Sequence, residues 1–261
     1  MMAELSSKVA LITGGLSGIG RAIVELFDQC DAHLVIADKA DRSRDDGLSG
    51  EELVKGLTSD ATYVRGDVSE QEDVNFIFQT ALERFGQVDV LVNNAGVTAF
   101  KPVDQLSIED FDLVMAVNVR GTFLCCQRAI IQMRKQKERG VIVNVASNFG
   151  FVGAPEASVY CASKGAVVTM TKALALETGP DGIRINALCP GATATEFNRQ
   201  HRAREGVLEN WARKTPLRIV GDDHFLASPG QIAKSALFLA TESSVYMTGA
   251  SLVVDGGWNA E

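Results

Sequence analysis

Short apolar runs alternate with helix-like segments along almost the whole chain of 261 residues. The apolar runs are continuous, which is typical of strands that are buried on both faces of a parallel sheet. No flexible linker, shift in composition or fixed-period repeat divides the chain. The pattern therefore predicts an α/β fold, a single doubly wound domain over 1–261 in which helices cover both faces of a parallel seven-stranded sheet. The seven strands are expected within 9–13, 33–38, 62–68, 88–96, 141–147, 184–191 and 251–257.

Helical periodicity fills most of the intervals between these strands. The stretch 38–50 is charged and contains glycines, so we expect an exposed loop there. The stretch at about 193–229 is predicted to be irregular and to form a lid over the active centre. The expected helices lie at 19–30, 70–85, 108–134, 158–177 and 232–241.

A tyrosine and a lysine are four residues apart in the helical pattern 158–177. Tyr160 and Lys164 should therefore lie on one helix face, where the ammonium group can favour the phenolate and lower the pKa of the phenol. Ser147 follows an apolar run and can present a hydroxyl to the same substrate oxygen. Taken alone, Tyr160 and Lys164 also suit a solvated helix face, so the prediction of proton transfer depends on the rest of the chain.

A glycine-rich turn, TGGLSGIG, joins the first apolar run to its helix. Glycines at this position allow a backbone to approach a pyrophosphate, which the helix N-terminus also attracts. By itself the turn also suits an ordinary strand–helix connection. Asp38 ends the second apolar run, where a carboxylate meets the hydroxyls of an adenosine ribose and repels a 2′-phosphate. Leu16 and Ser17 bring no positive charge to the turn, so NAD is predicted over NADP, although Lys39 can weaken this discrimination.

These motifs occur in one order together with NNAG at 93–96 and the pair Pro190–Gly191, and the chain thereby resembles the Rossmann-like short-chain dehydrogenase/reductase family. The similarity extends from Val9 to about Gly257. It implies a catalytic set of Asn118, Ser147, Tyr160 and Lys164. Tyr160 would exchange a proton with the substrate hydroxyl, and Ser147 would polarise its oxygen. Lys164 would hold the nicotinamide ribose and lower the pKa of Tyr160, and Asn118 would hold a water that links Lys164 to solvent.

The resemblance also implies which residues bind the cofactor. The glycine turn would hold the pyrophosphate, the residues after the second and third strands would hold the adenosine, and the residues after the sixth strand would meet the nicotinamide. Tyr160 and Lys164 would contribute to the same site. The other residues are Gly14, Leu16, Ser17, Gly18, Ile19, Gly20, Asp38, Asp67, Val68, Asn94, Ala95, Gly96, Pro190, Gly191, Thr193 and Thr195.

The substrate is expected to lie against Ser147, Tyr160 and the segments that cover them. Phe149, Phe197 and Arg199 are the further candidates for substrate contact. The lid contains five arginines, which favours an anionic or polyhydroxylated substrate such as a sugar or a sugar acid. The same arginines also suit a solvated lid surface, and the phenylalanines favour a bulky apolar alcohol.

We therefore predict an NAD-dependent enzyme that transfers a hydride between nicotinamide and a secondary alcohol/ketone pair, with a sugar or another polyhydroxylated or cyclic alcohol as substrate. Reduction of a 3-oxoacyl or steroid-type ketone is the alternative. A non-catalytic NAD-binding module would not need the Ser, Tyr and Lys set. A sugar-nucleotide epimerase would need a larger substrate region.

Composition argues against several other kinds of site, although a local basic patch stays open. The net charge of −8 argues against a nucleic-acid partner, because phosphate affinity comes mainly from Lys and Arg. The five cysteines and three histidines lack the spacing of a disulfide framework or of a metal site, so no metal is expected. The sequence shows neither a signal peptide nor a membrane-spanning run, which predicts a cytoplasmic protein without membrane partners. The family resemblance implies a homotetramer.

Overall fold

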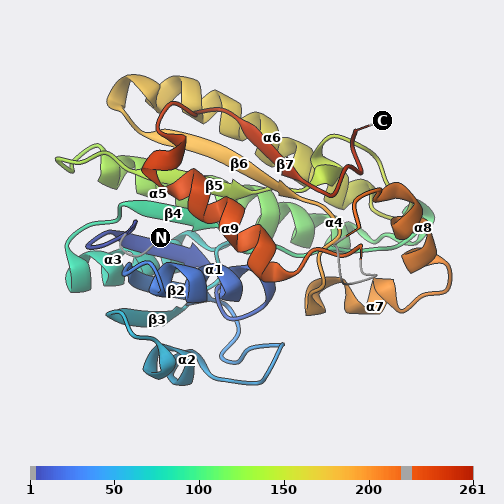
Figure 1. Cartoon of the computed structure of the whole chain (residues 1–261), viewed down its shortest axis with the longest axis horizontal. Helices are drawn as coiled ribbons and strands as arrows, with labels where there is room; N and C mark the ends of the chain where they lie inside the picture. Colours follow the sequence, from blue (N-terminus) through green and yellow to red (C-terminus); the bar gives the residue numbers. More distant parts are fainter. Residues whose placement is uncertain (1–3, 219–224, 261) are drawn as a thin grey trace.

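The computed structural model describes residues 4–218 and 225–260. Seven strands form one sheet in the order β3-β2-β1-β4-β5-β6-β7, and every neighbouring pair is parallel. The predicted α/β fold with a seven-stranded parallel sheet is confirmed (Figure 1). The strands are β1 (Val9–Thr13), β2 (His33–Asp38), β3 (Ala61–Arg65), β4 (Val90–Asn93), β5 (Val141–Val145), β6 (Arg184–Pro190) and β7 (Ser251–Val254).

Helices cover both faces of the sheet. On one face α1 (Gly18–Asp28) packs against α9 (Pro229–Ala240). On the other face lie α3 (Gln71–Phe85), α5 (Thr122–Met133) and α6 (Ser158–Thr178). The remaining helices are α2 (Gly50–Gly56), α4 (Ile108–Met115), α7 (Arg199–Arg202) and α8 (Val207–Lys214), of which α7 and α8 lie together at the end of the molecule beyond the sheet (Figure 1).

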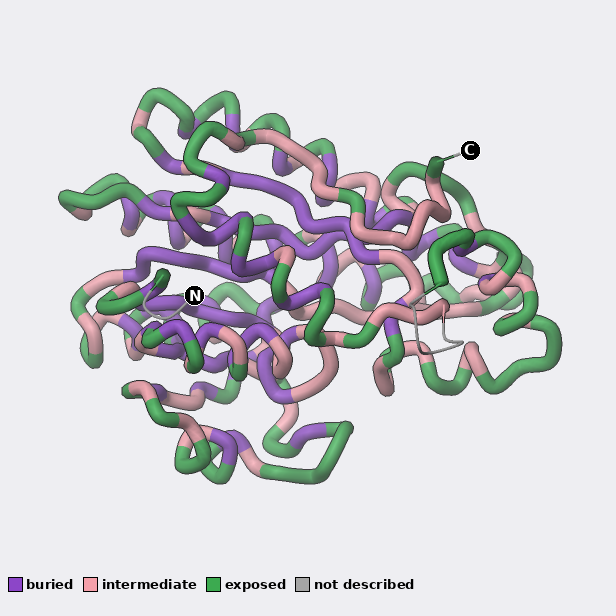
Figure 2. The backbone as a smooth tube through the Cα atoms, viewed as in Figure 1, coloured by how far each residue is buried: buried purple, intermediate pink, exposed green. Residues whose placement is uncertain are grey.

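Successive residues of the central strand β1 face opposite layers, as the two-residue period of a strand requires. Ala10 and Ile12 belong to the apolar cluster that includes α1 and α9, whereas Val9 and Leu11 belong to the cluster beneath α3 and α5. The central strands are therefore buried on both sides (Figure 2). This explains why their sequences are continuously apolar.

The strand order reverses between β1 and β4. β1 leads to β2 and β3 on one side, and β4 leads to β5, β6 and β7 on the other. In a doubly wound sheet the chain therefore leaves β1 and β4 in opposite directions, which opens a crevice above their carboxyl ends. The glycine turn follows β1, and the residues of NNAG end β4 and follow it, so both line this crevice.

The long helix predicted at 108–134 is interrupted. Residues Ala116–Gly121 form a π-helical segment between α4 and α5. A π-helical turn widens the helix locally and often occurs at a functional site. Here it contains Asn118, whose side chain bonds to neighbouring segments as described below. An apolar pattern alone does not show such a change of helical pitch.

No element was predicted for residues 51–61, which follow the predicted loop, but helix α2 covers Gly50–Gly56 and begins with a capping box of Ser49 and Glu52. The stretch at about 193–229 was predicted to be irregular, but its described part contains α7 and α8 as well as a short 3₁₀ turn. Helix α8 is amphipathic and buries Trp211, a pattern that was not used in the prediction. Positions 219–224 of the predicted lid lie outside the described residues.

Among the described residues, one helix, Ile108–Met133, is long and apolar enough to span a membrane by length and composition. Half of its most apolar window is buried inside the protein. Cys126, Ala129 and Met133 of this helix belong to the core beneath the sheet. The helix is therefore buried to the extent expected of a core helix in this fold.

Candidate active site

One cavity above the carboxyl ends of the strands reaches both the glycine turn and the Tyr160 region. Most residues that the sequence assigned to catalysis or binding line this cavity, although they come from seven separate segments. The predicted residues that line it are Gly14, Ser17, Gly18, Ile19, Asp38, Asp67, Val68, Asn94, Ala95, Gly96, Ser147, Phe149, Tyr160, Lys164, Pro190, Gly191, Thr193, Thr195 and Phe197.

Tyr160 and Lys164 lie one turn apart on α6, and both are buried. The Lys164 Nζ atom is 5.7 Å from the centroid of the Tyr160 ring and donates a hydrogen bond of 2.8 Å to the Val145 carbonyl oxygen. Gly150 allows this helix to approach closely, because a Cβ atom there would lie 3.0 Å from the Lys164 carbonyl oxygen. Strand β5 and the turn after it therefore fix the position of the lysine.

Ser147 follows β5 and faces the same cavity. Its Oγ atom accepts a hydrogen bond of 3.1 Å from the Phe149 backbone nitrogen and lies 3.2 Å from Asn148 Oδ1. The Asn148 carbonyl oxygen in turn accepts from Asn259 Nδ2 at 3.0 Å. This hydrogen bond joins the serine turn to the C-terminal segment. Its two residues are 111 positions apart, so it leaves no local pattern in the sequence from which it could be predicted.

Asn118 does not line the cavity but positions its wall. Its Oδ1 atom accepts from the Val97 backbone nitrogen at 2.8 Å, and its Nδ2 atom donates to the Val97 carbonyl oxygen and to Ser163 Oγ. The side chain thus joins the turn after β4 to helix α6. The family role of holding a water beside Lys164 stays a prediction.

Burial controls the ionisation of the two central groups. It raises the pKa of the Tyr160 phenol to about 12, although the hydrogen bond with Ser147 acts in the opposite direction. It lowers the pKa of the Lys164 ammonium to about 8. The expectation of a lowered pKa for Tyr160 is therefore wrong for the protein alone. Removal of each group from water disfavours its charged form, which raises the pKa of the phenol and lowers the pKa of the ammonium group.

The lowered pKa of Lys164 should make the free energy of unfolding depend on pH. Its folded value of about 8 lies below the ordinary 10.5. Between these values the unfolded chain binds the proton and the folded chain does not, so this residue's contribution to stability rises with pH. Relative to the Lys164→Met variant, the wild-type free energy of unfolding should rise by roughly 2–3 kcal/mol between about pH 7 and about pH 10. Urea unfolding of both proteins measures this change, and a constant difference would contradict it.

The glycine turn has the conformation and the close contacts that its sequence suggests. Gly14 and Gly18 have φ values of +64° and +56°, which favour glycine. Asn94 Nδ2 donates to the carbonyl oxygens of Thr13 and Gly14 at 3.0 Å, so the residues after β4 hold the turn. Leu16 and Gly20 do not line the cavity: Leu16 is buried in the core, and Gly20 packs against Gly14.

Asp38 lines the cavity at the end of β2. One carboxylate oxygen accepts from the Leu16 backbone nitrogen at 3.2 Å and the other from the Ala40 backbone nitrogen at 3.0 Å. Lys39 Nζ lies 2.6 Å from Asp67 Oδ2. Arg44 also lines this end of the cavity. It was not predicted from the sequence, because the fold of the loop 39–49 brings it there.

The opposite end of the cavity is bounded by residues after β6. A Cβ atom at Gly191 would lie 2.6 Å from the Asp255 Cα atom, so glycine allows the chain after β6 to pass the C-terminal segment. Thr193 is buried and donates to the Gly191 carbonyl oxygen at 3.0 Å. Thr195 contacts the glycine turn, since a Cβ atom at Gly18 would meet its Cγ2 atom at 3.2 Å. A crevice between two glycine-lined segments, with a carboxylate at the end of β2, fits a dinucleotide.

Aromatic side chains surround Tyr160. The ring centroids of Phe100 and Phe197 are each 6.1 Å from that of Tyr160, and the centroid of Phe149 is 6.5 Å away. Trp258 packs edge-on against Phe149 at 5.7 Å and lines the cavity with Trp211. The sequence analysis did not identify Trp258, which follows the last glycines of the chain.

Arg199 is the predicted substrate residue that the structure places elsewhere. It is exposed, pairs with Glu196 through an Nη1–Oε2 distance of 3.1 Å and does not line the cavity. Arg202 donates to the Thr195 carbonyl oxygen at 3.0 Å, and Arg204 bonds to Glu156 and to the Phe100 carbonyl oxygen. The side chains of these arginines therefore bond to neighbouring residues and do not line the cavity.

No group of three or more His, Cys, Asp or Glu side chains that could hold a metal occurs in the described part of the chain. Cys161, next to Tyr160, is partly buried, and burial raises the pKa of its thiol. A thiol with a raised pKa is a weak nucleophile at neutral pH. The surroundings of Cys161 therefore support a packing role rather than a catalytic one.

Comparisons with known proteins agree with this geometry. Residues 14–259 match a family model described as enoyl-(acyl carrier protein) reductase. The chain is 36% identical to glucose 1-dehydrogenase 2 of Bacillus subtilis, over 98% of this chain and 96% of that protein. It is also 36% identical to 2,5-dichloro-2,5-cyclohexadiene-1,4-diol dehydrogenase of Sphingobium indicum, over 99% and 100%. A crystal structure of a short-chain type dehydrogenase/reductase from Mycobacterium marinum superposes with a TM-score of 0.88 at 32% identity, over 98% and 97%.

Proposed function

Because the chain belongs to the short-chain dehydrogenase/reductase family, a family of nicotinamide-dependent oxidoreductases, we propose that it transfers a hydride between NAD and a secondary alcohol/ketone pair. The observation that carries the proposal is that Ser147, Tyr160 and Lys164 line the cavity that also reaches Asp38 and the glycine turn. Proton-transfer groups and a dinucleotide crevice thus share one space.

The protein's own groups bind the substrate oxygen and exchange its proton. The Ser147 hydroxyl binds and polarises the oxygen, and the Tyr160 phenol gives a proton to it or takes one from it. With a pKa of about 12, Tyr160 is protonated at neutral pH and is ready to donate in the direction of ketone reduction. In the oxidation direction, the charged form of Lys164, present below about pH 8, favours the phenolate. When bound, the nicotinamide supplies the hydride acceptor or donor.

NAD is proposed as the cofactor because the carboxylate of Asp38 is held in place at the end of β2. Backbone donors from Leu16 and Ala40 fix it, and a fixed carboxylate repels a 2′-phosphate. Lys39 could attract the 2′-phosphate of NADP, but its ammonium group pairs with Asp67, which reduces this attraction. Asp45, the residue after Arg44, also lines the cavity and carries the opposite charge.

The proposed substrate is an uncharged cyclic or polyhydroxylated alcohol. Phe100, Phe149, Phe197 and the two tryptophans offer flat apolar surfaces around Tyr160, and rings of sugars or cyclic diols can pack on such surfaces. The position of Arg199 weakens the case for a sugar acid. The relatives named for glucose and for a cyclohexadiene diol support the same class. Reduction of a 3-oxoacyl or steroid-type ketone is the alternative, which the apolar rings also favour.

A substrate panel with NAD and NADP in parallel tests this function. Cyclic diols, aldoses, steroid alcohols and 3-hydroxyacyl thioesters are supplied, and the absorbance of the reduced nicotinamide is followed. We expect reduction of NAD by a cyclic alcohol, with NAD preferred over NADP by about tenfold or more, as loss of a charged hydrogen bond implies. Discrimination of about twofold or less would overturn the role of Asp38. Conversion without cofactor reduction would indicate an epimerase.

We also propose a cytoplasmic homotetramer. Large apolar side chains are exposed on α4 and α5, among them Phe111, Phe123 and Ile131, and Leu176 and Val253 are exposed on α6 and β7. Exposed apolar side chains are typical of protein interfaces, and we propose that these helices and β7 form the contacts between subunits. Sedimentation of the protein gives its mass, and a monomer at micromolar concentration would contradict this proposal.

A further inference from the structure

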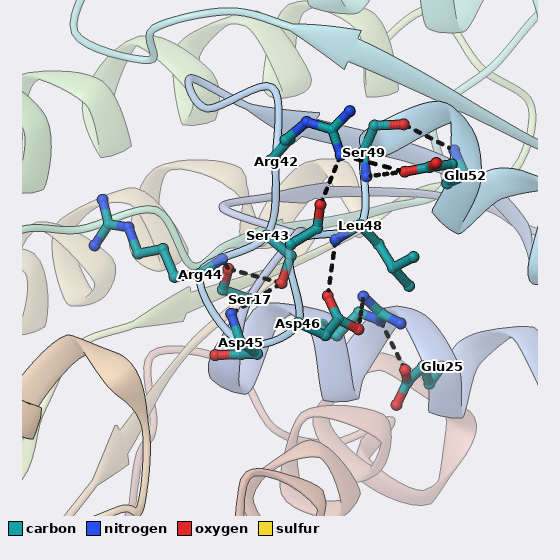
Figure 3. A network of polar contacts seen from close by, with 12 residues as sticks. Ser17, Glu25, Arg42, Ser43, Arg44, Asp45, Asp46, Leu48, Ser49 and Glu52 are labelled. Carbon is teal, nitrogen blue, oxygen red and sulfur yellow. Dashed lines mark hydrogen bonds and ion pairs between the residues drawn. The ribbon is translucent and has the colours of Figure 1, made fainter.

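The loop 39–49 between β2 and α2 is folded back on itself. Arg42 and Ser49 form an antiparallel bridge, and the Ser43 backbone nitrogen donates to the Leu48 carbonyl oxygen at 2.8 Å. Gly47 adopts a φ of +76°, and Ser43 is buried. This stretch, predicted to be an exposed loop, therefore has an ordered tip at residues 43–47 (Figure 3).

The tip contacts the glycine turn. Asp45 Oδ2 accepts a hydrogen bond of 2.6 Å from the Gly18 backbone nitrogen, and the Arg44 backbone nitrogen donates to Ser17 Oγ at 2.8 Å. Arg21 Nη1 on α1 lies 3.6 Å from Asp46 Oδ2. Three consecutive residues of the tip thus bind the start of α1.

Gly18 is the first residue of α1, and its N–H group has no partner within the helix. In a dinucleotide site the N–H groups at this position face the pyrophosphate. Asp45 lines the same cavity as Ser17 and Gly18. Its carboxylate therefore supplies a negative charge where the negative charge of the cofactor is expected.

A carboxylate and a pyrophosphate cannot both accept the Gly18 hydrogen bond, and their like charges repel. We propose that Asp45 determines how tightly this protein binds its dinucleotide: it occupies the pyrophosphate subsite and is displaced when the cofactor binds. The inference rests on the proposed function, since a dinucleotide is the ligand. A dinucleotide can bind only when the hydrogen bond between Gly18 and Asp45 is broken. The free energy needed to break it lowers the apparent affinity for the dinucleotide.

Titration of the cofactor-free protein with NADH, followed by NADH fluorescence, tests the proposal without turnover. Asp45→Ala and Asp45→Asn should each bind NADH about three- to tenfold more tightly than the wild type, as expected for removal of one solvent-exposed hydrogen bond. Asp41→Ala is the matched control, because Asp41 carries the same charge in the same loop but pairs with Arg65 and does not line the cavity. It should leave the affinity within about twofold.

Exchange of the Gly18 amide hydrogen in the cofactor-free protein gives an independent readout. This amide should exchange faster in Asp45→Ala than in the wild type and in Asp41→Ala. Unchanged or weaker NADH binding by both Asp45 variants, with melting temperatures equal to that of the wild type, would overturn the inference. Absence of NADH and NADPH binding in all four proteins would instead overturn the proposed function.

Discussion

Replacement of Tyr160 by phenylalanine should lower turnover by about 10²–10⁴-fold and leave NADH affinity nearly unchanged. The phenol hydroxyl exchanges the proton of the substrate oxygen, and phenylalanine has no group that can do so. The ring itself remains, so its contacts with Phe100, Phe149 and Phe197 persist and the cavity keeps its shape. Steady-state kinetics with an excess of cofactor, together with NADH titration, separates the two effects.

Tyr246→Phe is the matched control, because Tyr246 is fully exposed and loses the same hydroxyl. Its turnover should equal that of the wild type. Turnover of Tyr160→Phe within about threefold of the wild type would remove Tyr160 from the mechanism. Loss of NADH binding in that variant would show that the hydroxyl is needed for the cofactor rather than for the chemistry.

Replacement of Gly20 by alanine should destabilise the protein by about 2–4 kcal/mol and greatly weaken dinucleotide binding. The added Cβ atom would lie 2.0 Å from the Gly14 carbonyl oxygen and 2.4 Å from Asn94 Nδ2. A backbone oxygen cannot move aside as the end of a flexible side chain can, so the turn after β1 must shift away from α1. That shift displaces the backbone N–H groups that face the cavity.

Gly230→Ala provides the comparison for this change. Gly230 lies in the first turn of α9, where an added Cβ atom would have Ser228 Oγ at 4.0 Å as its nearest neighbour. The same methyl group should there be neutral or slightly stabilising, by up to about 1 kcal/mol. Urea unfolding and NADH titration of both variants measure the difference. A Gly20→Ala protein as stable as the wild type would contradict the packing described for this turn.

The architecture was predictable because the signals for it are local. Each strand is a continuous apolar run, and the helices between strands have the period of an amphipathic helix. The π-helical segment was missed because an apolar pattern does not show a change of helical pitch, and the bonds of its Asn118 go to Val97 and Ser163, which lie far from it in sequence. Helix α2 was missed for a different reason, since its capping box was present in the sequence but was not used.

The candidate site was predictable where motifs define it and not where the fold alone brings residues together. The glycine turn, Asp38 and the Tyr160–Lys164 pair have recognisable spacings. Trp258 and the Arg44–Asp45 tip reach the cavity only through the folding of segments that carry no motif. The pKa of Tyr160 was predicted in the wrong direction, because helical spacing shows that a lysine is near but does not show how deeply both groups are buried.

Direct transfer of hydrogen from the substrate carbon to the cofactor is the central claim. A cyclic alcohol that reduces NAD in the substrate panel is prepared with deuterium on its carbinol carbon, and the NADH formed is examined by mass spectrometry. Hydride transfer in the cavity beside Ser147 and Tyr160 predicts one deuterium in each NADH, with none lost to water. NADH without deuterium, or ketone formed while NAD stays oxidised, would contradict it.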